Sequence, residues 1–268
     1  MKREKKDSKD QERRSTLSGG NDVQPHIPLP LEIRVHGRGG QGGVTCAKLC
    51  ALVYSNLGLF AQTFGDYGME RAGAPVRAYT RVDRNPIKNR NKVYTPDHLL
   101  ILDPSLFGEG ILEGVRPGAL ILLNTQESLA AFEGRYEQFR FATVNATGIA
   151  RKWGIGSSAV VIVNTSIVGA YARLVDLPTA AIEETFSLLG LQRDIGAARD
   201  AYDSVEIREA RTDLELPEST SARGERHCEF HPNLERKRCG GCRASACPYP
   251  AAALGLRTGV PCAVHELV

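Results

Sequence analysis

The sequence predicts an α/β domain whose mostly parallel sheet is flanked by helices. Short apolar runs alternate with helical patterns between residues 31 and 212. Near-continuous apolar runs of this kind are typical of parallel strands that are covered on both faces. A Rossmann-like glycine-rich loop follows the first run, and a strand–loop–helix start of this kind is typical of α/β folds. At 268 residues the chain can hold one such domain and a small additional module.

Two segments define the start of this domain. The apolar run Ile33–Val35 predicts a buried strand that ends in a turn at His36 and Gly37. The segment Val44–Leu57 is apolar nearly all round, which predicts a helix covered on several sides. Gly58 then provides a C-terminal stop. Further strands are expected at Ala74–Val82, His98–Leu102, Ala119–Leu123 and Phe141–Val144, and further helices at Asn164–Val175 and Thr179–Leu189, with Pro178 at a helix-start position.

Composition divides the chain into four parts. Residues 1–30 are charged and then rich in Gly, Asn and Pro, so we expect a disordered tail or a strap across a partner, because such a segment buries little apolar surface. Residues 31–212 form the α/β domain. Residues 213–226 are polar and are interpreted as a linker. Residues 227–268 contain five of the seven cysteines and are interpreted as a small metal- or cluster-binding tail.

Charge and hydropathy exclude several classes of protein. A formal net charge of +3 is too small to indicate nucleic-acid binding, and no aromatic residues are interleaved with a basic run as a stacking platform requires. No apolar stretch approaches the roughly 20 residues that span a bilayer. Residues 1–14 are charged rather than apolar, which argues against a secretory signal. We therefore expect a cytoplasmic protein, in which the cysteines are free, buried or metal-bound rather than paired in disulfides.

The glycine-rich loop is the most distinctive segment. Gly37, Gly39 and Gly42 satisfy the pattern G-x-G-x-x-G between a strand and a helix. Such glycines let backbone N–H groups approach a ligand, and the following helix adds a partial positive charge that favours an anion. The alternative is that the loop is a tight turn that packs against a neighbouring chain. Arg38 would contact a phosphate if the loop binds a ligand, and would be an exposed structural residue if it does not. The candidate ligand-binding residues are Gly37, Arg38, Gly39, Gly40, Gln41 and Gly42.

A nicotinamide dinucleotide is disfavoured at this loop. That ligand requires an acidic residue at the end of a second strand, about 20 residues further on. Asp66 lies near that distance, but it is placed in the segment Phe64–Gly68, which is interpreted as a turn rather than a strand terminus.

Four segments together resemble the gamma subunit, or gamma domain, of pyruvate- and ketoisovalerate-type 2-oxoacid:ferredoxin oxidoreductases. Their order and spacing hold over residues 33–190, which makes the resemblance specific although each segment alone is weak. One departure is visible, because the family usually has two consecutive arginines before Gly-Ala-Pro, whereas Ala72 follows Arg71 here. The segments are Val35–Gly42, Gly68–Val76 continuing to Arg81, Asp97–Pro104, and Asn164-Thr165 leading into Gly169-Ala170.

The resemblance implies a subunit of a thiamine-diphosphate enzyme. In such a complex a 2-oxoacid is decarboxylated oxidatively, coenzyme A captures the acyl group, and electrons pass to iron–sulfur clusters and then to ferredoxin or a flavin/NAD subunit. The implied partners are alpha and beta subunits, which hold thiamine diphosphate, Mg and further clusters, and a ferredoxin-like delta subunit. A thiamine site begins with Gly-Asp-Gly, and Gly65-Asp66-Tyr67 does not match it. No Ser/His/Asp or Cys/His constellation with a suitable context appears in the sequence either, so we assign no catalytic residue to this chain.

Two smaller groups of residues allow more than one interpretation. Glu70, Arg71 and Arg77 are either ion-paired scaffolding or a lining of the cleft between subunits that holds an acidic substrate or coenzyme A. Cys46 and Cys50 lie four residues apart on one face of the predicted helix. Small cysteines that fill core space are far commoner than a site made of two thiols.

The cysteine-rich tail has the spacing of a metal or cluster site. Cys239 and Cys242 can reach one metal, and Cys247 follows after four residues and precedes Pro248, as at the end of a ferredoxin motif. Ferredoxins have two residues rather than four at that point, so a structural zinc site and unligated thiols remain alternatives. The expected group is a [4Fe-4S] cluster held by Cys228, Cys239, Cys242 and Cys247, with Cys262, His227, His231 and His265 as competing ligands.

Three hypotheses for function follow. The first is the gamma subunit of a coenzyme A-acylating 2-oxoacid oxidoreductase, in which residues 37–42 border the coenzyme A channel and the tail is a redox or docking module. The tail somewhat resembles the cysteine groups of flavin-linked electron-transfer subunits, so such a subunit is a further candidate partner. The second is a stand-alone nucleotide-binding protein with a structural zinc tail. The third is a scaffold without ligand contact.

Overall fold

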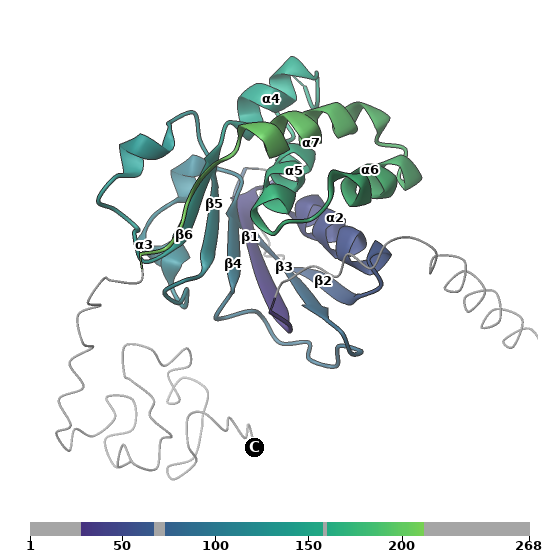
Figure 1. The fold of residues 1–268 in the computed structure, drawn as a ribbon, viewed down its shortest axis with the longest axis horizontal. Coiled ribbons are helices and arrows are strands. Elements are labelled where there is room, and N and C mark those ends of the chain that lie inside the picture. Colours follow the sequence, from purple (N-terminus) through teal and green to yellow (C-terminus); the bar gives the residue numbers. More distant parts are fainter. Residues whose placement is uncertain (1–27, 67–72, 158–159, 212–268) are drawn as a thin grey trace, which may run out of the picture.

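A seven-stranded sheet in the order β2-β3-β1-β4-β5-β6-β7 forms the centre of the domain (Figure 1). The computed structural model describes residues 28–66, 73–157 and 160–211. The strands are β1 (Leu31–Arg38), β2 (Phe60–Asp66), β3 (Pro75–Asp83), β4 (His98–Ile101), β5 (Leu120–Asn124), β6 (Arg140–Val144) and β7 (Glu206–Arg208). The helices are α2 (Gly43–Asn56), α3 (Glu109–Leu112), α4 (Ala146–Lys152), α5 (Asn164–Leu174), α6 (Thr179–Leu188) and α7 (Gln192–Ser204), with short 3₁₀ helices η1 (Pro104–Leu106) and η2 (Leu129–Phe132).

The sheet is mixed rather than mostly parallel. Strands β1, β4, β5 and β6 are parallel to one another, as expected from their apolar runs. Strand β3 is antiparallel to β1 and to β2, and β7 is antiparallel to β6. Antiparallel neighbours need no crossover helix, so β2 and β3 can be joined through a short connection. The prediction of a mostly parallel sheet is therefore right only for the four central strands.

The predicted elements are present, and several more accompany them. The first strand extends well beyond the predicted Ile33–Val35, because all eight residues of β1 pair with β3. Strands β2 and β7 and helices α4 and α7 were not predicted. Helix α7 buries only a narrow row of small side chains, Ala197, Ala198 and Ala201, so its sequence lacks the broad apolar stripe by which a helix is recognised.

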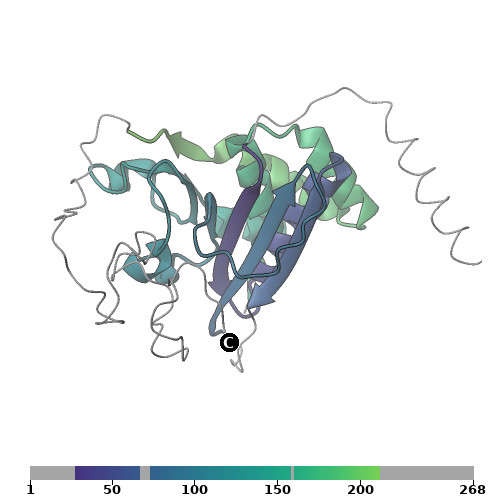
Figure 2. The same cartoon turned by 90° about the horizontal axis from the view of Figure 1, so that it is seen from below.

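The two faces of the sheet are covered in different ways. Helices α2, α5, α6 and α7 lie on one face (Figures 1 and 2) and enclose the larger core with Ile33, Val35 and Leu100 of the strands. On the other face, Leu99, Ile101 and the neighbouring strands β5 and β6 form a smaller core. That core is closed by short segments, including η2 and part of α3, rather than by long helices.

Helices α5 and α7 approach each other closely at Gly169. A Cβ atom on this residue would lie 2.1 Å from the carbonyl oxygen of Ala198, a distance that no carbon–oxygen contact allows. The absence of a side chain therefore sets the distance between the two helices, and it explains why a glycine stands in the middle of α5 despite its low helix propensity.

Two buried arginines bind loops to the face of the sheet that the long helices do not cover. Arg34 of β1 donates to the carbonyl oxygens of Ile111 (2.6 Å) and Glu113 (2.9 Å). Arg81 of β3 forms an ion pair with Glu32 and donates to the carbonyls of Asn89 and Lys92. Burial, followed by the charge of Arg77, lowers the pKa of Arg34 to about 10. Such hydrogen bonds are what makes the burial of two guanidinium groups tolerable.

Several predictions concern residues outside the described ranges. They are the N-terminal tail up to residue 27, the linker, and the cysteine-rich tail with its four candidate ligands. Within the ranges described above, none of the helices is long and apolar enough to cross a bilayer.

Candidate functional site

The glycine-rich loop lies where the chain changes direction within the sheet. From β1 the chain passes through α2 to β2 and β3 on one side, whereas β4 leads to β5 on the other side. The carboxyl ends of β1 and β4 therefore form a topological switch point, the place where open α/β sheets bind their ligands. Residues 39–42 follow β1 at this edge, and Asp103 follows β4.

Two glycines of the loop have a conformation that other residues rarely adopt. Gly40 has φ 99° and Gly42, the N-cap of α2, has φ 83°. A Cβ on Gly42 would lie 2.9 Å from Nδ2 of Asn164, the first residue of α5. The loop is thus a tight turn that packs against α5 of its own chain, and its exposed side lies around Gly40.

Asp103 links the loop to the end of β4. Its carboxylate accepts a hydrogen bond from Gln41 Nε2 at 2.6 Å and forms an ion pair with Arg38 Nε at 3.3 Å. Arg38 also donates to Ser105 Oγ at 2.8 Å. Burial alone would raise the pKa of Asp103, but hydrogen bonds from Ser105 and Gln41 and the charge of Arg38 lower it below its ordinary value. The carboxylate is therefore ionised at neutral pH.

The six candidate ligand-binding residues are thus brought together at one edge of the sheet. The N-terminus of α2 has no acidic residue in its first turn, which leaves its partial positive charge available to an anion. The side chain of Arg38 is 36% exposed, but Asp103 already balances its charge. An anion at this loop would have to share Arg38 with Asp103.

Asp66 ends a strand, contrary to the prediction of a turn. It is the last residue of β2 and pairs with Lys92 at 2.8 Å. The prediction failed because Phe60–Asp66 mixes polar and apolar residues and is stabilised as a strand by β3. Strand β3 separates Asp66 from β1 and the glycine loop, so the carboxylate does not have the position that a nicotinamide ribose requires.

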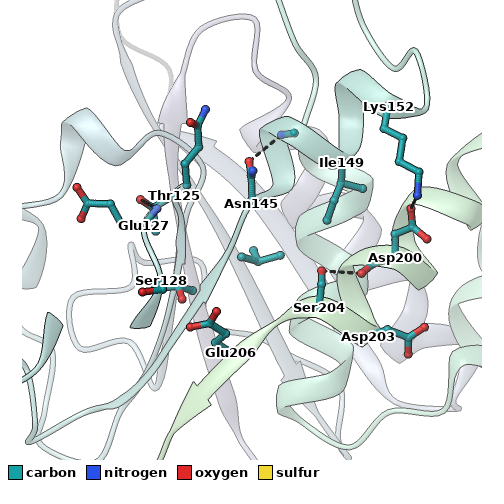
Figure 3. Close-up of a pocket in the computed structure, with 14 residues that line it drawn as sticks. Thr125, Glu127, Ser128, Asn145, Ile149, Lys152, Asp200, Asp203, Ser204 and Glu206 are labelled. Carbon is teal, nitrogen blue, oxygen red and sulfur yellow. Dashed lines mark hydrogen bonds and ion pairs between the residues drawn. The ribbon is translucent and has the colours of Figure 1, made fainter. Parts of the chain in front are cut away.

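A pocket of about 550 Å³ opens at the carboxyl ends of β5 and β6 (Figure 3). None of the candidate residues 37–42 lines it. Its walls carry four carboxylates and one ammonium group, and Lys152 pairs with Asp200 at 2.7 Å. Hydrogen bonds from Lys152 and Trp153 lower the pKa of Asp200. The pocket is lined by Thr125, Gln126, Glu127, Ser128, Thr143, Val144, Asn145, Gly148, Ile149, Lys152, Asp200, Asp203, Ser204 and Glu206.

The sequence analysis did not single out this pocket. A usable indication was present, because Thr125 and Asn145 come directly after the apolar runs that became β5 and β6. Polar residues at the carboxyl ends of adjacent parallel strands lie at one edge of a sheet. The acidic side chains from α7 could not be anticipated, because that helix itself was not predicted.

The cysteines and acidic residues of the described part form no metal site. In residues 28–66, 73–157 and 160–211, no three His, Cys, Asp or Glu side chains are grouped to hold a metal ion. Cys46 and Cys50 are free and buried, which confirms their interpretation as core residues. A hydrogen bond to Cys50, together with burial, raises the pKa of Cys46, so its thiol stays protonated. Glu70 and Arg71 lie outside the described residues.

Comparison with known proteins gives a consistent result. The sequence model of the family described as pyruvate ferredoxin/flavodoxin oxidoreductase matches residues 32–203. The chain is 37% identical, over 187 residues, to the pyruvate/ketoisovalerate oxidoreductases common subunit gamma of Thermococcus kodakarensis, covering 67% of this chain and 99% of that protein. It is 37% identical to pyruvate synthase subunit PorC of Methanothermobacter marburgensis, and the match covers 65% of this chain and 97% of that protein. The crystal structure of pyruvate oxidoreductase subunit PORC from Thermotoga maritima superposes with a TM-score of 0.58 at 28% identity, covering 67% of this chain and 99% of that one.

Proposed function

Since the chain belongs to the pyruvate ferredoxin/flavodoxin oxidoreductase family, we propose that it is the gamma subunit of a coenzyme A-acylating 2-oxoacid oxidoreductase. The observation that carries the proposal is the match to gamma and PorC subunits over 97–99% of their own length. The reaction would be the oxidative decarboxylation of a 2-oxoacid such as pyruvate, a branched-chain or an aryl 2-oxoacid. Thiamine diphosphate with Mg, held on partner subunits, would supply the carbanion chemistry.

The chain would complete the assembly rather than perform the chemical step. Its proposed partners are the alpha and beta subunits that bind thiamine diphosphate, a ferredoxin-like delta subunit and, as a further candidate, a flavin-containing electron-transfer subunit. Electrons would pass through iron–sulfur clusters to ferredoxin or to a flavin/NAD subunit. The cysteine-rich tail would add a [4Fe-4S] cluster, with zinc as the alternative, on Cys228, Cys239, Cys242 and Cys247.

The glycine-rich loop is the part of the chain that we propose to border the coenzyme A channel. Support comes from its position at the switch point, from the N-terminus of α2 without acidic residues, and from the partly exposed Arg38. A phosphate of coenzyme A would share the guanidinium of Arg38 with Asp103, and the backbone N–H groups of the first turn of α2 would face the same anion.

Purification of the tagged chain from its native cells tests the proposal. We expect it to carry a partner polypeptide with bound thiamine diphosphate, and we expect 2-oxoacid-dependent reduction of a viologen dye only when coenzyme A is supplied. Recovery of a solitary monomer that binds a nucleotide would instead support the second hypothesis and would remove the first.

Replacement of Arg38 tests the role of the loop. In the assembled complex, Arg38→Ala should raise the KM for coenzyme A by roughly tenfold, because a charge-assisted hydrogen bond is worth about 1.5–3 kcal/mol. The KM for the 2-oxoacid should not change. Arg193→Ala, which removes an exposed cation from α7, is the matched control. An unchanged KM for coenzyme A in the Arg38 variant would leave the loop with a purely structural role.

A further inference from the structure

A group of cations lies on the sheet face that faces away from α2. Because Ile33 and Val35 point into the helical core, the alternate residues Arg34 and His36 of β1 point to the opposite face. Across the antiparallel ladder, Tyr79 lies opposite Arg34, and Arg77 lies opposite His36. Directly opposed residues share a face of the sheet, so these four side chains lie on one face, together with Asp66 of β2, which lies opposite Arg77 on its other side. Arg34, His36 and Tyr79 are buried there and Arg77 is exposed; we name this region the Arg77 surface.

Most cations on or beside this surface already have partners in the chain. Arg34 is buried and donates to backbone carbonyls, and Lys92 pairs with Asp66 at 2.8 Å. Arg77 differs from both. It is the third residue of β3 and is exposed, and within the described part of the chain its side chain has neither a hydrogen bond nor an ion pair. The carboxylate of Asp66, opposite Arg77 on β2, pairs with Lys92 instead.

His36, next to Arg77, also has unused hydrogen-bonding capacity. The residue is 4% exposed, and its Nε2 atom is buried without a hydrogen-bond partner among the residues that the structure describes. A buried polar atom without a partner is rare in folded proteins and calls for an explanation. Burial, and after it the charges of Arg34 and Arg77, lower the pKa of His36 to about 3. Desolvation is the main cause and the two guanidinium charges add to it, so an anion placed beside Arg77 would offset only the contribution of those charges.

We propose that the Arg77 surface receives a carboxylate side chain from a neighbouring polypeptide, with Arg77 as the direct contact and His36 as the group that supports it from within the sheet. The proposal rests on the proposed function, since it assigns the neighbour to the same complex. Strand β2, which is the outermost strand next to β3 among the described residues, extends the area that such a neighbour can cover.

A polypeptide fits this surface better than a small molecule. Small ligands bind in concave pockets that bury most of their surface, whereas Arg77 stands on a strand face and does not line the pocket at β5 and β6. Partner surfaces commonly bury a broad area around a few anchoring residues, and arginine is one of the residues enriched among them. A guanidinium also binds a carboxylate through two parallel hydrogen bonds, which fixes the orientation of the partner.

The test measures assembly of the full-length chain with its partner subunits. Arg77→Glu should weaken the affinity by about tenfold or more and should flatten its dependence on ionic strength, because a favourable charge contact becomes repulsive. Arg77→Lys should retain most of the affinity. Arg193→Glu makes the same charge reversal on α7, on the other face of the sheet, and should leave assembly unchanged.

The outcomes separate the two proposals. If the unmodified chain binds no thiamine-bearing partner, the proposed function fails. If it binds and Arg77→Glu behaves like Arg193→Glu, the present inference fails alone. If assembly is unaffected but the KM for coenzyme A or the 2-oxoacid rises, the surface binds a small anion and the inference is wrong.

If the melting temperature shows that Arg77→Glu is unfolded, the affinities of Arg77→Gln and Arg77→Lys for the partner subunits are compared instead. Crosslinking from Arg77→Cys should then identify a peptide of the partner that contains Asp or Glu.

Discussion

Gly42 shows how a single residue sets the geometry of the candidate site. Its φ of 83° is left-handed, and a Cβ atom would lie 2.9 Å from Asn164 Nδ2. Gly42→Ala should lower the free energy of unfolding by about 1–2 kcal/mol through the backbone alone, and further through displacement of Asn164. Gly190 has φ 74° and open space around it, so Gly190→Ala should show only the backbone cost. Chemical denaturation of both variants measures the difference, and equal losses would mean that Asn164 moves aside freely.

One buried histidine, His36, and one half-buried histidine, His98, should make the domain sensitive to acid. Desolvation is the main cause that lowers the pKa of His36 and of His98 to about 3 in the folded chain, whereas the unfolded value is about 6.5. Between these values the unfolded chain binds more protons, so the free energy of unfolding falls as the pH falls, by up to about 1.4 kcal/mol per pH unit for each histidine. This loss begins above the pH at which the carboxylates titrate.

Urea unfolding between about pH 7 and pH 5 measures this effect, because most carboxylates remain ionised there. The His36→Gln/His98→Gln double variant should show a much shallower dependence on pH than the unmodified chain. If both slopes were the same, protonation of other groups would have to account for the acid sensitivity.

The sequence predicted the location of the site residues better than their interactions. The glycine pattern identified residues 37–42, and these lie at the edge of the sheet where an α/β fold binds its ligands. The ion pair between Arg38 and Asp103 could not be predicted, because it joins the last residue of β1 to a residue that follows β4, and the register of these two strands depends on the whole sheet. The strand position of Asp66 was missed for a similar reason, since a partner strand rather than local sequence holds it extended.

At the scale of the secondary structure elements, the contact between α5 and α7 is the most constrained. Gly169→Ala should destabilise the domain by about 3 kcal/mol or more, because the methyl group would overlap the Ala198 carbonyl and force two helices apart. Gly110 in α3 has open space at its Cβ position, and Gly110→Ala should be neutral or stabilising by up to about 1 kcal/mol. Thermal unfolding of the two variants compares them, and a tolerant Gly169→Ala would show that α7 can shift along α5.

The elements that sequence patterns identified share one property, an apolar face that is broad or continuous. Strands β4 and β5 and helices α2 and α5 have such faces and lie within one or two residues of their predicted positions. Strand β7 is only three residues long, and α7 meets its neighbours through alanines. Both depend on tertiary contacts, β7 on β6 and α7 on α5, so local patterning could not have revealed them.

At the scale of the whole molecule, the two groups of cysteines should differ in chemistry. Cys46 and Cys50 belong to the packed core, whereas the predicted cluster ligands are in residues 227–268. Iron and acid-labile sulfide analysis of the anaerobically purified full-length chain should find both elements. Cys239→Ser/Cys242→Ser should abolish them, and Cys46→Ala should not. Zinc in place of iron would favour the structural zinc site, and a chain without metal would mean that the thiols are unligated.

Strand β2 has a consequence for how the cell makes this protein. Among the described residues no strand pairs with its outer edge, and all seven of its residues are only half-buried. An open edge of this length can pair with another chain. Copies of this chain that are made in excess of the neighbouring subunits that cover the edge are therefore prone to self-association. We therefore expect synthesis of this chain to be matched in amount to that of its neighbours, and overproduction alone to yield aggregates that co-expression prevents.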